Sequence, residues 1–213
     1  MGDFSKKQID NIYQIIYRID PSNDTINLND NLLEHAYINK LPLHIVNIFL
    51  DDNLLNKITW RTNQYINILS LKNNLFSTND TNEFEDFKCN KLFMDKNKMD
   101  ELTFVNCKFK LLSLSDNLLK ELNFFDCEVE ELNISFNKLV NVITLPNNLI
   151  KLNISYNLIN EIFADFISTI EHLDLSNNKL NNISNLPYNL KYLNLSNNNF
   201  TKFKNLELVL VIS

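Results

Sequence analysis

The sequence predicts an α/β solenoid, a fold in which short repeats stack along one axis. Two observations carry this prediction. An asparagine recurs roughly every 20 to 23 residues over most of the 213-residue chain. Apolar residues stand at the same relative positions around each of these asparagines. About nine repeats follow one another without a linker, so we expect a single domain.

Each repeat contains the same phrase, in which apolar residues precede and follow the asparagine at fixed distances. The order is apolar, two residues, apolar, one residue, apolar, two residues, Asn, one residue, apolar, and residues 170–180 and 190–200 are the clearest copies. The asparagines, here called the ladder asparagines, are Asn31, Asn53, Asn74, Asn97, Asn117, Asn137, Asn157, Asn178 and Asn198.

The phrase explains why the copies must stack. Its central part alternates apolar and other residues, which is typical of a strand with one buried face. A single strand buries little, whereas stacked copies form a parallel sheet over a continuous core. The chain must then turn, and the buried backbone at that turn needs hydrogen-bonding partners. An Asn amide supplies two donors and an acceptor, so we interpret the ladder as structural.

The amino-terminal segment, residues 1–21, is expected to form a helical cap over the first repeat. Ser5 and Gln8 match a capping box, and Pro21 would end the helix. The apolar stripe of this helix would be Ile9, Ile12, Tyr13, Ile16 and Ile19.

The solenoid is expected to span residues 22–204, with residues 205–213 as a terminal strand of the same domain. The third repeat is the longest, which favours a loop insertion near residues 78–83. The apolar run from Leu206 to Ile212 leaves an exposed strand edge, a feature that invites pairing. The sequence allows either a homodimer through this run or a partial chain.

The composition argues against nucleic acid as a partner. The net charge is −6, and the charged residues of neighbouring repeats alternate in sign instead of forming a basic stripe. We interpret them as cross-strand pairs that stabilise the sheet. They are Lys108 and Lys110 beside Glu128 and Glu130, and Glu131 beside Lys151.

The sequence offers no pattern for catalysis, a metal or a cofactor. Serines recur at one repeat position, at Ser115, Ser135, Ser155, Ser176 and Ser196, which is typical of a repeat consensus and not of a nucleophile. Cys89, Cys107 and Cys127 do not have zinc-site spacing, and we expect reduced, buried thiols. Cys107 and Cys127 occupy the same position of adjacent repeats, so a redox pair is the alternative.

The sequence also shows no pattern typical of a membrane span or of an export signal. No stretch approaches 18 apolar residues, and the first residues contain neither an apolar run nor a small-residue cleavage site. These features favour a cytoplasmic protein, in its own cell or in an infected host cell.

The repeat phrase over residues 22–203 resembles that of the leucine-rich repeat superfamily. The short period and the Leu-Pro starts at residues 145–149 and 186–190 are similar to bacterial effectors of this class. The abundance of Asn, Ile and Lys resembles repeat proteins of giant DNA viruses and AT-rich protists. The resemblance implies a right-handed solenoid with a curved parallel sheet on the concave face and extended or 3₁₀ backbone on the convex side.

The resemblance also implies that a protein partner binds the concave face. Exposed aromatic side chains are the usual anchors of such contacts. The candidates at positions expected on that face are Phe136, Tyr156, Phe49, Phe93, His172 and Tyr192. The hypothesis is a non-catalytic protein-recognition scaffold. The alternative is an assembly component that associates through the terminal strand.

Overall fold

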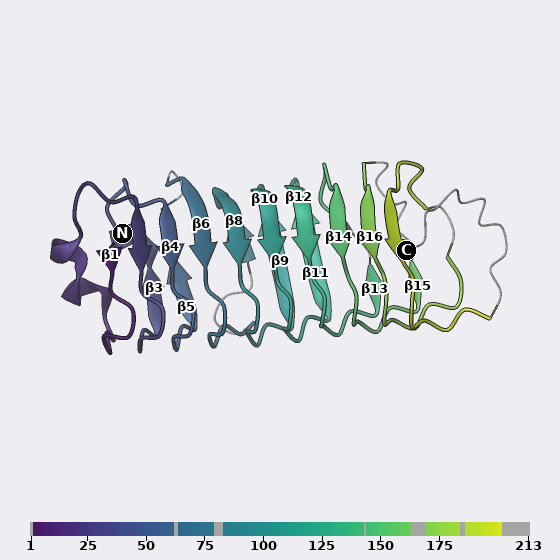
Figure 1. Ribbon diagram of the computed structural model, residues 1–213, viewed down its shortest axis with the longest axis horizontal. Helices are drawn as coiled ribbons and strands as arrows, with labels where there is room; N and C mark the ends of the chain where they lie inside the picture. Colours follow the sequence, from purple (N-terminus) through teal and green to yellow (C-terminus); the bar gives the residue numbers. More distant parts are fainter. Residues whose placement is uncertain are drawn as a thin grey trace.

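The protein is a β-solenoid whose strands lie across its long axis (Figure 1). The computed structural model describes residues 2–61, 64–78, 83–142, 144–162, 169–183 and 186–201. One wall is a ten-stranded parallel sheet in the order β1-β2-β4-β6-β8-β10-β12-β14-β16-β17. Its strands are β1 (Gly2–Asp3), β2 (Thr25–Asn27), β4 (Asn47–Phe49), β6 (Ile66–Ser70), β8 (Cys89–Phe93), β10 (Lys108–Ser113), β12 (Glu128–Asn133), β14 (Lys151–Asn153), β16 (His172–Asp174) and β17 (Tyr192–Asn194).

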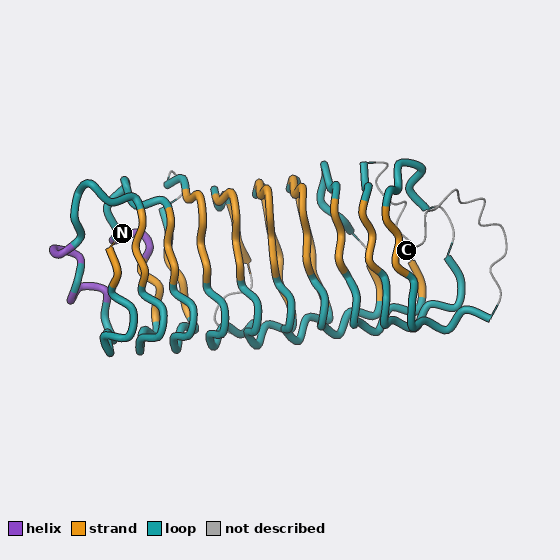
Figure 2. Tube along the Cα trace, viewed as in Figure 1, coloured by secondary structure: helices purple, strands orange, loops and turns teal. Residues whose placement is uncertain are grey.

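The opposite wall consists of parallel strands in three groups. They are β3 (His35–Tyr37) with β5 (Lys57–Thr59), β7 (Glu83–Glu85) with β9 (Glu101–Val105) and β11 (Glu121–Phe125), and β13 (Asn141–Val142) with β15 (Glu161–Ile162). A 3₁₀ turn, η3 (Ile38–Lys40), follows β3. The expected extended backbone is therefore organised into a second set of strands (Figure 2).

The core lies between the two walls and runs the length of the described solenoid. It contains the apolar residues of the repeat phrase, such as Leu112, Leu114 and Leu119 in the fifth repeat, all fully buried. Equivalent residues of successive repeats pair in register, for example Leu112 with Leu132. The prediction that alternating leucines face one continuous core is confirmed.

The ladder asparagines connect each coil to the one before it. The Asn117 amide donates to the carbonyls of Leu114 and Ser115 in its own coil, and to that of Met94 in the preceding coil. Its Oδ1 accepts from the backbone N–H of Met99, also in the preceding coil. The other ladder asparagines make the same pattern of hydrogen bonds, as Asn157 does. 

The residue before each ladder asparagine adopts a left-handed backbone. These residues have φ between about 53° and 57°, and most of them are Asp or Asn, which tolerate this conformation. They are Asp30, Asp52, Asn73, Lys96, Asp116, Phe136, Tyr156, Asn177 and Asn197, here called the corner row. A solenoid with a single glycine can therefore turn sharply at every coil.

The expected amino-terminal helix is wrong in its form, although the segment does cover the core. It consists of two single 3₁₀ turns, η1 (Ile12–Gln14) and η2 (Ile16–Arg18). The cap of η1 is Asn11, whose side chain accepts from the N–H of Tyr13, and not Ser5. The buried stripe is Ile9, Ile12, Ile15 and Ile19, whose spacing of mostly three residues suits a 3₁₀ turn.

The reason is that residues 2–9 are already used as part of a coil. β1 pairs with β2, with Gly2 opposite Ile26. Asn31 donates to the Phe4 carbonyl, and its Oδ1 accepts from the N–H groups of Lys7 and Ile9. Lys6 has a φ of 55°, as the corner row does. This partial coil precludes a helix that begins near Ser5.

Two of the cysteines lie at a second corner of the coil. There, Asn106 and Asp126 have left-handed backbones, and Cys107 and Cys127 follow them. The Cys107 thiol donates to the carbonyls of Val105 and Phe84, and the Cys107 N–H donates to Cys127 Sγ at 3.3 Å. The thiols thus connect coils as the ladder amides do, and all three cysteines are free and buried.

Two predictions lie outside the described residues. Most of the insertion expected at residues 78–83 and all of the strand expected at residues 205–213 are not described. The homodimer through Leu206–Ile212 therefore stays a prediction.

Candidate recognition surfaces

The outward side of the ten-stranded sheet, here called the sheet face, carries two rows of side chains in strict register. The first row is Thr25, Asn47, Ile68, Lys91, Leu111, Glu131, Lys151, His172 and Tyr192. The second row is Asn27, Phe49, Ser70, Phe93, Ser113, Asn133, Asn153, Asp174 and Asn194. This face is the one that the resemblance places on the concave side.

Four of the predicted site residues lie on the sheet face. Phe49 and Phe93 stand in the second row, two strands apart, with Ser70 between them. His172 and Tyr192 are neighbours in the first row, with ring centroids 6.2 Å apart. Because equivalent repeat positions pair between strands, the two residues of each pair lie on the same surface.

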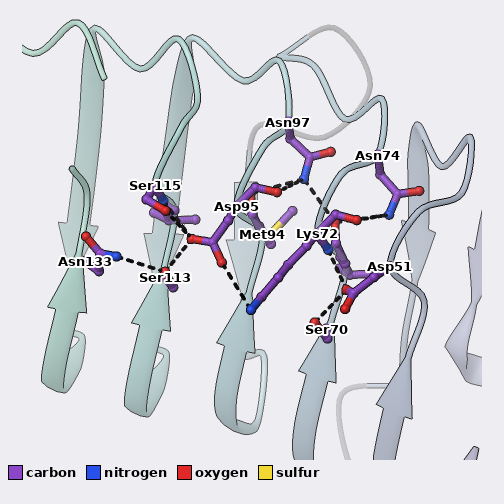
Figure 3. Close-up of polar contacts among 12 residues, drawn as sticks. Asp51, Ser70, Lys72, Asn74, Met94, Asp95, Asn97, Ser113, Ser115 and Asn133 are labelled. Carbon is purple, nitrogen blue, oxygen red and sulfur yellow. Dashed lines mark hydrogen bonds and ion pairs between the residues drawn. The ribbon is translucent and has the colours of Figure 1, made fainter. Parts of the chain in front are cut away.

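A polar network fixes the side chains beside Phe93 (Figure 3). The Asp95 carboxylate accepts from both the N–H and the hydroxyl of Ser115, and from the hydroxyl of Ser113. The Lys72 ammonium lies 3.9 Å from Asp95 Oδ2 and 4.5 Å from the centroid of the Phe93 ring. The lysine therefore covers part of the ring and fixes its position.

The sheet face is hollowed between β8 and β17. The hollow has a volume of about 630 Å³, and its lining includes Phe93 and Leu111 towards β8, and His172, Asp174 and Tyr192 towards β17. The Lys151 ammonium donates to Glu131 at 3.0 Å in its middle. The β8 end of the hollow is therefore apolar, and the β17 end carries aromatic and acidic groups.

Phe136 and Tyr156 do not lie on the strands. They belong to the corner row, in the bends that follow β12 and β14. Their rings stack in parallel, with centroids 4.1 Å apart and planes inclined by 9°. Their side chains are 51% and 47% exposed. These two residues, here called the corner pair, form a flat aromatic surface at the edge of the sheet face.

The corner pair is costly to the isolated protein. A left-handed backbone disfavours residues with a Cβ by roughly 1 to 2 kcal/mol, and aromatic side chains gain no compensating local hydrogen bond there. The flanking coils use Asp116 and Asn177 at the same position. Stacking offsets about 0.5 to 1.5 kcal/mol of the cost. The same coils and the one before them expose three other apolar side chains, at Leu118, Val140 and Leu158.

Two of the charged pairs expected between coils are ion pairs in the structure, Lys108 with Glu128 and Lys151 with Glu131. Lys108 Nζ lies 2.6 Å from Glu128 Oε2, and this hydrogen bond raises the pKa of Lys108 and lowers that of Glu128. Lys191 likewise lies 2.8 Å from Glu171 and lowers its pKa. These pairs are largely exposed, so they contribute little individually.

The described serine hydroxyls and cysteine thiols, which are the reactive side-chain types of the repeats, make structural contacts. The hydroxyls of Ser135 and Ser155 donate to Asn133 and Asn153. Burial raises the pKa of the Cys107 thiol to about 12, which makes a thiolate unfavourable. Within the described ranges, no group of three or more His, Cys, Asp or Glu residues could hold a metal ion, and no helix is long and apolar enough to cross a membrane.

Several residues of the surface were not singled out from the sequence. Leu111 and Asp174 line the hollow, and Lys72 covers Phe93. The signal for Leu111 and Asp174 was present, because both stand at the outward positions of the repeat phrase. Lys72 stands two residues before a ladder asparagine, where the phrase alone does not give the direction of a long side chain.

Comparisons with known proteins add a likeness of fold. No protein-family model matches the chain, and no curated protein is significantly similar to it. Among solved structures it is similar to YopM from Yersinia enterocolitica WA-314, with 20% sequence identity and a TM-score of 0.35. The match covers 82% of this chain and 47% of YopM, so the chain spans about half the length of that protein.

The resemblance to leucine-rich repeat proteins comes from the repeat phrase of the sequence. The repeat period, the long parallel sheet and the ladder of asparagines in the structure independently agree with that resemblance.

Proposed function

We propose that the protein is a non-catalytic recognition scaffold that binds a protein partner through the sheet face and the adjoining corner. The observation that carries the proposal is the corner pair. Phe136 and Tyr156 are exposed, stacked and held in a backbone conformation that costs the folded chain stability. Burial of these two aromatic side chains against a partner would contribute favourable binding free energy.

The rest of the surface supports the same role. Phe49, Phe93, His172 and Tyr192 lie on one rigid sheet, and register fixes their positions. A solenoid presents such side chains over a long surface, which suits contact with a macromolecule better than with a small metabolite. The proposed location, the cytoplasm of the protein's own cell or of a host cell, follows only from the sequence.

The experiment replaces the corner pair by the residue that other coils use. The double variant Phe136→Asn, Tyr156→Asn should change the free energy of unfolding by less than about 1 kcal/mol, since it relieves left-handed strain but loses the stacking. Affinity capture from a lysate of cells that express the protein should then lose at least one specifically bound protein by tenfold or more.

The matched control is Phe125→Asn. Phe125 is 53% exposed on β11, in the opposite wall, so this variant removes an exposed aromatic residue from another surface. Capture should be unchanged. Equal capture by the wild type and the corner variant would show that the corner pair does not bind a partner.

A further inference from the structure

The hollow on the sheet face contains amide groups of fixed orientation. Asn133 Oδ1 accepts from the N–H and the hydroxyl of Ser135, and Asn153 Oδ1 accepts from the same groups of Ser155, at 2.7 to 3.2 Å. A backbone N–H can only donate, so these bonds determine which end of each amide is the oxygen. The NH₂ groups of Asn133 and Asn153 are therefore the ends left for other contacts.

These NH₂ groups retain donor capacity. Asn133 Nδ2 makes one long contact, 3.4 Å, with Ser113 Oγ (Figure 3). Asn153 Nδ2 has no acceptor among the residues that the structure describes. The two asparagines are opposite each other on β12 and β14. Amide donors of this kind suit the carbonyl oxygens of a polypeptide main chain.

The β17 end of the hollow combines a carboxylate with aromatic rings. Asp174 accepts from the Ser176 N–H and from Asn194 Nδ2, and no ion pair with it is found within the described part of the chain. His172 stands on the same strand and the same face, and Tyr192 is its neighbour, 42% exposed. A guanidinium matches this combination, because it stacks on flat rings and pairs with a carboxylate through two N–H groups.

The β8 end is apolar, and its distance from Asp174 is set by the sheet. Phe93, Ser113, Asn133, Asn153 and Asp174 stand in one row on five successive strands. Four steps of about 4.8 Å give roughly 19 Å between the two ends. An extended chain covers that distance in about six residues.

We propose that the hollow binds an extended segment of a partner polypeptide, which places an arginine against Asp174, His172 and Tyr192 and an apolar side chain about six residues away against Phe93 and Leu111. The two asparagine amides bind its main-chain carbonyls between these anchors. The proposal rests on the role as a recognition scaffold, and it uses none of the corner-pair side chains.

The test is selection from a phage-displayed library of random dodecapeptides on the full chain. We expect selected peptides to share an arginine and, about six residues from it, Leu, Ile, Phe or Met. The best peptide should bind Asp174→Asn at least tenfold more weakly than wild type, and replacing its arginine by lysine should weaken binding at least fivefold. The control Asp116→Asn, which removes an exposed carboxylate of the corner row, should leave binding unchanged.

Several outcomes would overturn the proposal. These are selection of no motif, selection of a motif without arginine, or equal binding of the best peptide to wild type and Asp174→Asn. A wild-type dimer that Asp174→Asn dissociates would assign the hollow to a second copy instead. The corner variant distinguishes the two proposals, because it should still bind the peptide whether or not the corner pair has a partner.

Discussion

At the scale of single residues, the ladder asparagines hydrogen-bond each coil to the one before it. Each fully bonded amide donates to three carbonyls and accepts from one buried N–H, as Asn117 does. Leu or Ala at this position would leave the Met99 N–H without a partner, which costs about 1 to 3 kcal/mol. The three carbonyls would each lose one hydrogen bond, at about 0.5 to 1.5 kcal/mol apiece, and keep another from Asn97, Asn137 or the Lys96 N–H. This explains why the position is the most regular of the repeat.

Asn117→Ala should therefore lower the free energy of unfolding by about 3 to 5 kcal/mol. Asn198→Ala is the matched comparison, because Asn198 makes the same type of bonds but is only partly buried. Its loss should cost about 1 to 2 kcal/mol. Urea denaturation followed by circular dichroism measures both, and equal effects would contradict the dependence on burial.

His35 makes stability depend on pH. Its ring stacks on Tyr37 with centroids 3.6 Å apart, and its Nε2 is buried without a hydrogen-bonding partner among the described residues. Burial, with a smaller contribution from the charge of Lys57, lowers its pKa from the ordinary 6.5. The unfolded chain therefore binds a proton at a pH where the folded chain does not. The resulting stability is present above pH 6.5 and is lost as pH falls through the folded-state pKa.

The variant His35→Gln should reduce this dependence. Thermal unfolding measured at a series of pH values below 6.5 should show a smaller loss of Tm for the variant than for the wild type. His44→Gln, a change of an exposed histidine, should keep the wild-type slope. A slope unchanged in His35→Gln would exclude this histidine as a source of the effect.

At the scale of elements, an aromatic column stabilises the second wall. Trp60, Phe84, Phe104 and Phe124 stack along successive coils, with centroids 5.2 to 5.5 Å apart. Phe104 stands in the middle of the column and is fully buried. The strands β7, β9 and β11 thus derive much of their stability from packing between coils.

Phe104→Ala should lower the free energy of unfolding by about 3 to 5 kcal/mol, because it removes a large buried ring and leaves a cavity. Trp60 is the only tryptophan of the chain, so its fluorescence reports on this column directly. Phe125→Ala, a change at an exposed position of β11, should cost less than about 0.5 kcal/mol. A similar loss in both variants would contradict the column's role.

The elements also show what the sequence predicts well and where it fails. The strands after each repeat start were predictable, since alternation and the asparagine fix both face and register. The amino-terminal helix was not, because Ile15 and Ile16 are both apolar, so the run that starts at Ile9 and Ile12 fits a period of three residues as well as one of 3.6. Contacts from Asn31, distant in sequence, decide between them by holding Lys7 and Ile9 in a coil.

At the scale of the whole molecule, each coil is stabilised by its immediate neighbours only. Stability in such solenoids is close to a sum of coil and interface contributions. Leu132 and Ile134 in the sixth coil are buried, whereas Leu193 and Leu195 in the ninth are only partly so. Amide hydrogen exchange should be slowest in β8 to β14 and faster in β17. Uniform protection over these strands would indicate a single cooperative unit instead.

The surface also combines features that the repeat pattern predicts with features that depend on contacts between side chains. Alternation alone placed Phe49, Phe93, His172 and Tyr192 on one face. The hollow depends on side-chain lengths and on the network around Asp95, which a repeat pattern does not specify. The corner pair was found from sequence, but its cost became visible only through the left-handed backbone of Phe136 and Tyr156.

The bonds of the ladder have a direction. Each asparagine satisfies backbone groups of the coil that precedes it, as Asn137 does for Leu114 and Leu119. A ribosome releases the chain from its amino terminus, so every newly emerged coil completes the one made just before. The nascent protein can then fold coil by coil behind the exit tunnel, with only its most recent coil incomplete at any moment. A chain released from denaturant, by contrast, has no preferred starting point.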